Sequence, residues 1–302
     1  MELYANLHIH STHSDGGFSP AEVAYICKGE GYKAIAITDH DIATAYPEMK
    51  VACDKLGMEC IFGAEFSAPS ELLMTPDYYN QLEPTFHITA YHFDPEYPAM
   101  KQYLEDMSIR ETEQTHVLFD RGVRLGLIKG IDWDEVLEYN KGIKWICNMH
   151  LWRAMLDKGL LTQADRPWFW KELFAEHRWE VPPHREFKQE HELIQLILDA
   201  GGIPIVAHPH EQLKFMDALI EMGVQGLEVW HGMMTEQERE QAIKMAYEKN
   251  LYISGGSDHS GMSDGLTAFR AKANDPAYQP INTRGTTKQH YEEIRDRKLN
   301  RW

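Results

Sequence analysis

Two histidines near the start of the chain have the spacing of a metal-binding pair. His8 and His10 stand two residues apart at the end of an extended run, Tyr4 to Ile9, so both rings point to the same side. Imidazole nitrogens bind divalent ions, and two on one side can share an ion. Such a pair alone is often a coincidence, but here Ser14-Asp15-Gly16 follows it and Thr38-Asp39-His40-Asp41 matches it. Together these segments predict a metal site.

Metal-ligand residue types also follow most of the other expected strands. They are Asp39 and His40 after the second strand, Glu65 at the third, His87 at the fourth, His208 at the fifth, His231 at the sixth, and Asp258 with His259 at the seventh. A random scatter of histidines would not follow the strands. For His13, His92, His210 and His231, a structural role explains the pattern at least as well as metal binding does.

Two of the carboxylates in this set, Glu65 and Asp258, have distinct expected roles. Glu65 has two oxygens with which to bridge neighbouring ions, although capping a helix at the strand end is the alternative. Asp258 lies in SGGSDHSG, where glycines let the backbone approach ligands closely, and it is the natural carboxylate for a first ion.

A centre of this kind can cleave esters or amides. Two ions about 3.5–4 Å apart can hold a hydroxide between them and polarise phosphoryl oxygens for in-line attack. Asp258 is the candidate to orient that hydroxide or accept its proton, and His259 or His210 could protonate the leaving group.

Seven short apolar or β-branched runs could form the strands that carry these residues. They are Tyr4 to Ile9, Ala34 to Thr38, Glu59 to Phe66, Phe86 to Tyr91, Ile203 to Ala207, Gly226 to Trp230 and Leu251 to Gly255. Helix signals separate them, most clearly Ser19-Pro20-Ala21-Glu22, where Ser19 can cap and Glu22 can complete a capping box. Such alternation gives a parallel sheet, open or closed into a barrel, with sites at the carboxyl ends of the strands. For a chain of 302 residues we expect an α/β fold, a distorted (β/α)7 barrel with an insertion.

The alternation stops between Pro95 and about Glu190, where the sequence becomes helical, charged and rich in tryptophan. We therefore predict that residues 1–104 and 191–302 form the barrel and that residues 105–190 form a helical insertion that acts as a lid. His150, Arg153 and Lys144 from this insertion could close over a substrate. A last helix is expected from Thr287 to Lys298.

Composition limits the partners. A formal net charge of −17 would repel duplex nucleic acid, and a small phosphorylated substrate would need bound cations to reverse the sign locally. No run approaches the roughly 20 apolar residues that span a bilayer, and MELYANLHIH lacks the features of a signal peptide. We expect a soluble, cytoplasmic protein whose four cysteines are reduced.

These motifs, in this order, resemble those of the PHP (polymerase and histidinol phosphatase) family. The matching segments are LHIHSTHSDGG, AITDHD, IFGAEFS, IVAHPH and GGSDHSG. The resemblance implies a first ion on His8, His10, Glu65 and Asp258, and a second on Glu65, His87 and His208. It implies a third on Asp15, His40 and a histidine two places after Asp258, a position that Ser260 holds here. Two to three divalent ions, manganese, zinc or iron, are thus implied.

The insertion is similar to that of the family's nucleotide phosphatase and small-RNA exonuclease branch, with CNMHLWRAML in place of a helix that begins near Arg-Pro-His. Asn148 stands where that branch has the arginine, so substrate recognition can differ. Side chains that are adjacent in an extended segment oppose each other, so His259 should point away from Asp258 unless the strand end bulges.

The resemblance implies a metal-dependent phosphoesterase that acts on a small nucleotide or sugar phosphate. A phosphodiesterase acting on a cyclic phosphate is the alternative closest in chemistry, and the altered third site favours it. A two-metal amidohydrolase is also conceivable, but such sites commonly use a bridging lysine, and no lysine lies at an expected strand end. A non-catalytic scaffold would have lost several ligands, whereas eight of the nine positions are filled.

Overall fold

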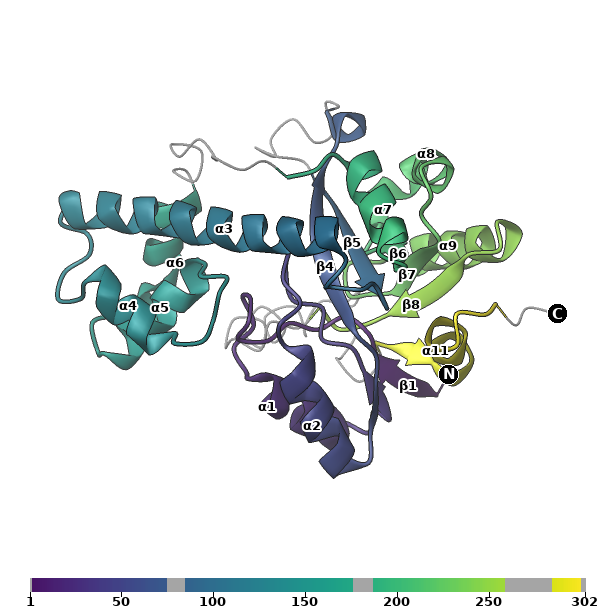
Figure 1. The fold of residues 1–302 in the computed structure, drawn as a ribbon, viewed down its shortest axis with the longest axis horizontal. Coiled ribbons are helices and arrows are strands. Elements are labelled where there is room, and N and C mark those ends of the chain that lie inside the picture. Colours follow the sequence, from purple (N-terminus) through teal and green to yellow (C-terminus); the bar gives the residue numbers. More distant parts are fainter. Residues whose placement is uncertain (1, 75–84, 176–186, 259–283, 300–302) are drawn as a thin grey trace.

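The computed structural model describes residues 2–74, 85–175, 187–258 and 284–299, whose strands form two sheets (Figure 1). The first sheet consists of β1 (Leu3–Asn6), β2 (Ala34–Ile35), β3 (Glu59–Cys60) and β9 (Thr286–Thr287), in the order β3-β2-β1-β9. The second consists of β4 (Gly63–Pro69), β5 (Thr85–Tyr91), β6 (Ile203–Val206), β7 (Gly226–Trp230) and β8 (Tyr252–Gly255), in that order. Each predicted strand region thus contains a strand, and the third is divided into β3 and β4.

The directions of the strands differ from the expected parallel alternation. β5 runs antiparallel to both β4 and β6, and β9 runs antiparallel to β1. Parallel strands are usually joined by a helix, whereas the described part of the link before β5 holds only a 3-10 turn, η1 (Glu71–Leu73). The chain is a mixed α/β protein, and the predicted (β/α)7 barrel is not confirmed, because the strands within the described ranges form two sheets and no closed barrel.

Backbone hydrogen bonds nevertheless connect the two sheets on both sides. Leu7 donates its N–H to the Gly255 carbonyl at 3.2 Å, and Asp41 donates to the Glu65 carbonyl at 2.8 Å. Apolar side chains fill the space where the sheets meet, including Leu7, Ile205 and Tyr291. The ends of β1, β2, β4 and β8 are therefore held close together.

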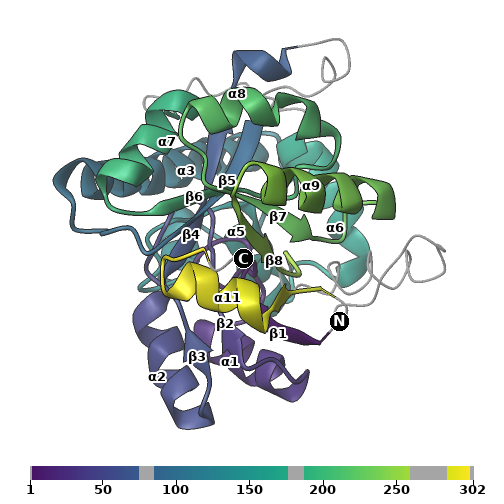
Figure 2. The same ribbon diagram turned by 90° about the vertical axis from the view of Figure 1, so that its right-hand side faces the viewer.

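Helices cover the outer faces of both sheets. They are α1 (Pro20–Gly29) and α2 (Tyr46–Leu56) on the first sheet, α7 (Glu190–Asp199), α8 (Met216–Glu221) and α9 (Glu236–Glu248) on the second, and α11 (Lys288–Arg295) against β1 and β8. Figure 2 shows α1 and α2 at one end of the molecule and α7, α8 and α9 at the other. The predicted capping box is present at α1, where Ser19 Oγ accepts the Glu22 N–H at 3.3 Å and the Glu22 carboxylate accepts the Ser19 N–H at 2.8 Å.

The predicted insertion contains α3 (Pro98–Arg124), α4 (Trp133–Tyr139), α5 (Asn148–Asp157), η2 (Gln163–Asp165), α6 (Arg166–Phe169) and the π-helical turn η3 (Trp170–Ala175). These elements share a core of their own that includes Phe119, Val136 and Trp152. Met100 and Met107, near the start of α3, pack instead in the core of the second sheet. α3 therefore extends from the sheets into the insertion, and the expected boundary at residue 105 lies inside one continuous helix (Figure 1).

No helix in the described ranges is long and apolar enough to cross a membrane.

Candidate metal centre

The eight ligands predicted from the sequence gather in clusters whose candidate ligand atoms lie within 4.8 Å of one another. The clusters are His8, His10, Glu65 and Asp258, then Glu65, His87 and His208, and finally His10, Asp15 and His40. They are carried by the segments that follow β1, β2, β6 and β8, and by β4 and β5 themselves. Residues far apart in the sequence thus meet at one end of the sheets.

Glu65 lies between the first two clusters and is fully buried. Its Oε2 atom is 3.2 Å from His8 Nε2 and 3.3 Å from His10 Nε2. Its Oε1 atom is 3.1 Å from His87 Nδ1 and 3.3 Å from His208 Nε2. Oε2 is also 3.3 Å from His40 Nδ1. Because the two oxygens face different histidines, one carboxylate could be shared by two ions.

Asp258 completes the first cluster, with Oδ1 at 2.9 Å from His10 Nε2 and 3.5 Å from His8 Nε2. Its side chain is 29% exposed, so it remains accessible from the solvent. Asp258 has φ 48° and His208 has φ 31°, both in the left-handed region that non-glycine residues rarely adopt. Such backbone is typical of functional sites, where the surrounding structure holds a strained residue in place.

His87 reaches the centre because β5 is reversed. It lies near the start of β5 and is paired with Ser67, near the end of β4. In an antiparallel pair, the start of one strand lies beside the end of the other. The reversal therefore places His87 at the same edge as Glu65.

The third cluster has fewer ligands of its own. Asp15 Oδ1 is 3.6 Å from His10 Nδ1, and the His40 ring stacks on the His10 ring with centroids 4.5 Å apart. His10 Nε2 already faces Glu65 and Asp258, so an ion here would depend mainly on Asp15 and His40. His40 also contacts the shared carboxylate, with Nδ1 3.3 Å from Glu65 Oε2. His259 and Ser260, which the sequence singled out, lie outside the described residues.

The donor set fits divalent cations. His8 Nε2, His10 Nδ1 and both Glu65 oxygens are buried and form no hydrogen bond within the described part of the chain. Burial favours the neutral ring of His8, but Glu228, Glu65 and Asp258 outweigh it and hold the pKa of His8 well above its usual range. Burial disfavours the Glu65 carboxylate, yet the nearby histidines hold its pKa well below the usual range. Cations at the centre would take the place of these protons, as metal binding to histidine requires.

Asp39, the aspartate of the TDH segment, fixes the loop that carries the ligands. It is buried, and its carboxylate accepts the Ser11 N–H at 2.7 Å, the Ser11 hydroxyl at 2.7 Å and the Ser14 hydroxyl at 2.6 Å. Gly256 supports the same loop from the other side, since a Cβ atom there would lie 2.3 Å from the His8 nitrogen. The glycine thus permits the close backbone approach expected from the sequence.

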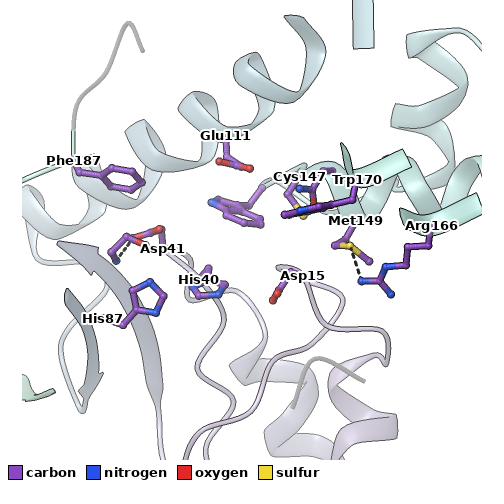
Figure 3. A pocket seen from close by; sticks show the side chains of 13 residues that line it. Asp15, His40, Asp41, His87, Glu111, Cys147, Met149, Arg166, Trp170 and Phe187 are labelled. Atoms are coloured by element: carbon purple, nitrogen blue, oxygen red, sulfur yellow. Dashed lines mark hydrogen bonds between the residues drawn. The ribbon is translucent and has the colours of Figure 1, made fainter. Parts of the chain in front are cut away.

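A cavity of about 280 Å³ lies between the centre and the insertion (Figure 3). Asp15, His40 and His87 line it on the side of the centre. Its other lining residues come mainly from the insertion and its flanks: Asp41, Ser67, Glu111, Trp145, Cys147, Asn148, Met149, Arg166, Trp170 and Phe187. The Trp145 ring stacks near the His40 ring, with centroids 6.4 Å apart and planes at 25°. The cavity therefore joins candidate metal ligands to aromatic walls.

The basic residues predicted to bind substrate make structural contacts instead. His150 is buried, accepts the Cys147 N–H at Nδ1 (3.0 Å) and has Nε2 3.0 Å from the Thr12 carbonyl oxygen. Burial, with Arg153 nearby, lowers the pKa of His150 to about 4, so the ring is neutral. Both of its nitrogens are engaged with the backbone, which leaves neither for a substrate.

Substrate binding by Arg153 and His210 stays a prediction. The Arg153 guanidinium donates to the carbonyls of Asp15 (3.0 Å) and Gly16, and so attaches α5 to the loop that carries Asp15. His210 begins a 3-10 turn, η5 (His210–Phe215), and is not among the residues that line the cavity.

Sequence reasoning missed Glu228, a buried residue of β7 whose carboxylate lies 3.0 Å from His8 Nδ1. Its only signal was a charged residue inside the apolar run GLEVW. His231, left open between ligand and structural roles, has Nε2 3.3 Å from Asp258 Oδ2. Both residues lie behind the first cluster, away from the cavity lining.

The sequence profile of the PHP domain family matches residues 6–177, more than half of the chain. The chain belongs to the PHP domain family. The predictions of family membership and of a metal-dependent phosphoesterase are therefore confirmed.

Three curated relatives that align over most of their length share 23–26% identity with the chain. A 5'-3' exoribonuclease of Haemophilus influenzae is 26% identical over 84% of this chain and 88% of its own. A phosphoribosyl 1,2-cyclic phosphate 1,2-diphosphodiesterase of Eggerthella lenta is 23% identical over 86% and 95%. A 3',5'-nucleoside bisphosphate phosphatase of Chromobacterium violaceum is 26% identical over 86% and 88%.

Solved structures show the same fold. A protein of Bifidobacterium adolescentis aligns with a TM-score of 0.74 and 24% identity, covering 99% of this chain and 97% of its own. An amidohydrolase of Chromobacterium violaceum with bound sulfate aligns with a TM-score of 0.67 and 20% identity, covering 97% and 96%. Identities this low carry information about the fold and none about the reaction.

Proposed function

We propose that this PHP protein hydrolyses a phosphate ester of a nucleotide at the centre described above. Three ion sites are proposed: a first on His8, His10, Glu65 and Asp258, a second on Glu65, His87 and His208, and a third, weaker one on Asp15 and His40. Divalent ions bound there would supply positive charge and activate water for attack on phosphorus. The observation that carries the proposal is the cavity in which His40 and His87 adjoin Trp145, Trp170 and Phe187.

The side chains of the chain have distinct parts in this proposal. Glu65 would serve both of the first two sites, because its two oxygens face different histidines. Asp258 is the group that orients the attacking water or accepts its proton, since it joins the cluster through Oδ1 yet stays partly exposed. Proton transfer of this kind typically contributes roughly 10²–10⁴-fold to a rate.

The aromatic walls favour a substrate with a planar ring. Aromatic side chains stack on nucleobases with about 1–3 kcal/mol per base, irrespective of the base. Trp145 is buried, and Trp170 is 45% exposed and so presents part of its surface to a ligand. At about 280 Å³, the cavity is near the lower end of the roughly 300–1,000 Å³ typical of small-molecule sites, which favours a mononucleotide or a strand end.

The names of two relatives agree with a nucleotide, since one is a nucleoside bisphosphate phosphatase and one an exoribonuclease. A cyclic phosphate is the second candidate. It is favoured by the similarity to the Eggerthella lenta diphosphodiesterase, 95% of which the alignment covers. A cyclic sugar phosphate carries no aromatic ring, so it would leave the tryptophans of the cavity without a partner.

A substrate panel tests the proposal. Manganese-loaded protein would be assayed with a nucleoside 3',5'-bisphosphate, a short 5'-phosphorylated RNA, ribose 5-phosphate and a ribose 1,2-cyclic phosphate. Chromatography would identify and quantify the products, because a single cleavage of the RNA or of the cyclic diester releases no inorganic phosphate, and phosphate release would be measured for the monoesters. We expect the highest kcat/KM for a nucleotide and a loss with Trp145→Ala that is confined to nucleotides. Preference for the cyclic phosphate would favour the second candidate. Full metal loading without hydrolysis of any of these compounds would contradict the proposal.

A further inference from the structure

Glu228 connects two of the candidate ion sites from behind. It lies in β7, is 1% exposed, and uses a single oxygen, Oε2, for two contacts. His8 Nδ1 is 3.0 Å from this oxygen, and the backbone N–H of His208 donates to it at 2.8 Å. His8 belongs to the first cluster and His208 to the second, so one carboxylate holds a ligand of each.

The contact with His8 selects the form of the ring that can bind an ion. A ligating imidazole nitrogen must carry a lone pair, and in a neutral ring the other nitrogen then carries the proton. His8 Nε2 faces Glu65 Oε2 at 3.2 Å, so Nε2 is the ligating atom and Nδ1–H is the donor to Glu228. Carboxylates commonly hold metal-bound histidines in this way, and their loss typically costs roughly 10–100-fold in metal affinity.

The contact with His208 acts on the backbone. His208 has φ 31°, a conformation that costs of order 1–3 kcal/mol unless the surroundings hold it. The hydrogen bond from its N–H to Glu228 holds the residue where its ring reaches Glu65 Oε1, 3.3 Å from Nε2. Glu228 therefore supports the second site without touching its ion.

An ion bound between His8, Glu228 and His231 is the competing interpretation, since their ligand atoms are close enough. His231 Nδ1 accepts the Met233 N–H at 3.1 Å, so the proton of the neutral ring is on Nε2, which faces Asp258 Oδ2 at 3.3 Å. Nε2 is then a donor and has no lone pair for an ion. Glu228 Oε2 already accepts two N–H groups, which leaves Oε1, buried and without a hydrogen bond among the described residues, as the oxygen that such an ion would have to use.

We propose that Glu228 is a positioning residue that couples the first and second ion sites, by fixing the His8 ring and the His208 backbone with one oxygen. The inference rests on the proposed function, because it assumes that His8 and His208 bind ions. It concerns metal affinity, and it can therefore be tested without a substrate.

The test compares Glu228→Ala, Glu228→Gln and a control, Glu240→Gln, which changes an exposed glutamate on the neighbouring helix α9. Manganese affinity and stoichiometry would be measured by calorimetry, and retained metal by elemental analysis after gel filtration. We expect Glu228→Ala to weaken the two tight ions together by roughly 10–100-fold. Glu228→Gln should recover most of the affinity, because its amide oxygen can accept both N–H groups, and Glu240→Gln should match the unmodified protein.

Other results would overturn the proposal. Loss of one ion from Glu228→Ala with unchanged affinity for the rest would establish the competing ion site, and unchanged binding of every ion would remove the positioning role. Thermal unfolding of the metal-free variants shows whether they fold. If Glu228→Ala does not fold, the proposal requires Glu228→Gln to retain a near-normal affinity for manganese. An unmodified protein that binds no metal would refute the proposed function. If the protein binds metal but hydrolyses no compound of the panel, the proposed function fails, and the metal affinities of the Glu228 variants still decide the role of Glu228.

Discussion

Replacing Glu65 by Gln should disturb two ion sites at once, because its oxygens face different histidines. Oε2 lies within 3.3 Å of His8, His10 and His40, and Oε1 lies within 3.3 Å of His87 and His208. The substitution keeps the shape of the side chain and removes its charge. Losing an indirect support of a metal ligand typically costs roughly 10–100-fold in affinity, so losing a shared ligand should cost at least about 100-fold for each ion. That corresponds to about 2.7 kcal/mol per ion.

Turnover should fall further than metal content. Ions that polarise a phosphoryl oxygen contribute several kcal/mol to the transition state. A loss of about 4 kcal/mol corresponds to roughly a thousandfold in rate, so Glu65→Gln should have less than about a thousandth of the normal kcat at a manganese concentration that saturates the unmodified protein.

The geometry also predicts selectivity. His87→Ala should release the second ion and leave the first in place, because His87 Nδ1 contacts only the Oε1 side of Glu65, at 3.1 Å. Elemental analysis after gel filtration counts the ions, and phosphate release with the best substrate of the panel gives the rate. Glu248→Gln, an exposed change on α9, is the control. Normal metal content and rate in Glu65→Gln, or loss of both ions from His87→Ala, would refute this account of the shared carboxylate.

Three further predictions follow from the centre and its cavity. Metal affinity should rise with pH, because the pKa values of His8 and His10 are raised and a bound ion must displace the protons on these rings. Metal binding should therefore release protons, and calorimetry in buffers of different ionisation enthalpy would show no proton release if this is wrong. Arg153→Lys should weaken the ion at Asp15 more than the other two, since it loses the paired contacts to the loop; equal weakening of all ions would contradict this. Ser260→His should add a tightly held third ion, counted by elemental analysis, and an unchanged count would show that residue 260 does not reach Asp15 and His40.

The positions of the ligands could be predicted because residue type and strand ends are both visible in a sequence. Apolar runs locate the strands, and most candidate ligands stand at or beside one of them, which is why Glu65 and His208 could be expected to lie close together without a structure. The direction of a strand is not visible in its own residues. β5 was therefore expected to be parallel, and only its pairing with β4 and β6 shows otherwise.

The structural roles of Glu228 and His150 could not be predicted, because each role depends on contacts with residues that are distant in the sequence. Glu228 meets His8 across 220 residues, and a glutamate in an apolar strand does not indicate which residue it will face. His150 stands on a helix of the insertion beside Arg153, a pattern that suggested substrate contact. In the fold it instead accepts the N–H of Cys147, the residue just before that helix, and meets the Thr12 carbonyl.

The negative charges around the cavity require that metal ions bind before a phosphorylated substrate does. Asp15, Asp41 and Glu111 line it, with Arg166 as the cationic side chain among its described lining residues. Two unit charges 4 Å apart repel by about 1 kcal/mol in water and by about 4 kcal/mol near a protein surface. Without metal, the protonated rings of His8 and His10 would offset part of this charge, but the carboxylates of Asp15, Glu65, Glu111 and Asp258 outnumber them, so a phosphate dianion would still meet net repulsion. Bound ions reverse this sign locally, so metal removal should weaken substrate binding itself as well as abolish turnover. Equal affinity for a non-hydrolysable nucleotide analogue in metal-loaded and chelator-treated protein would show that the aromatic walls alone hold the substrate.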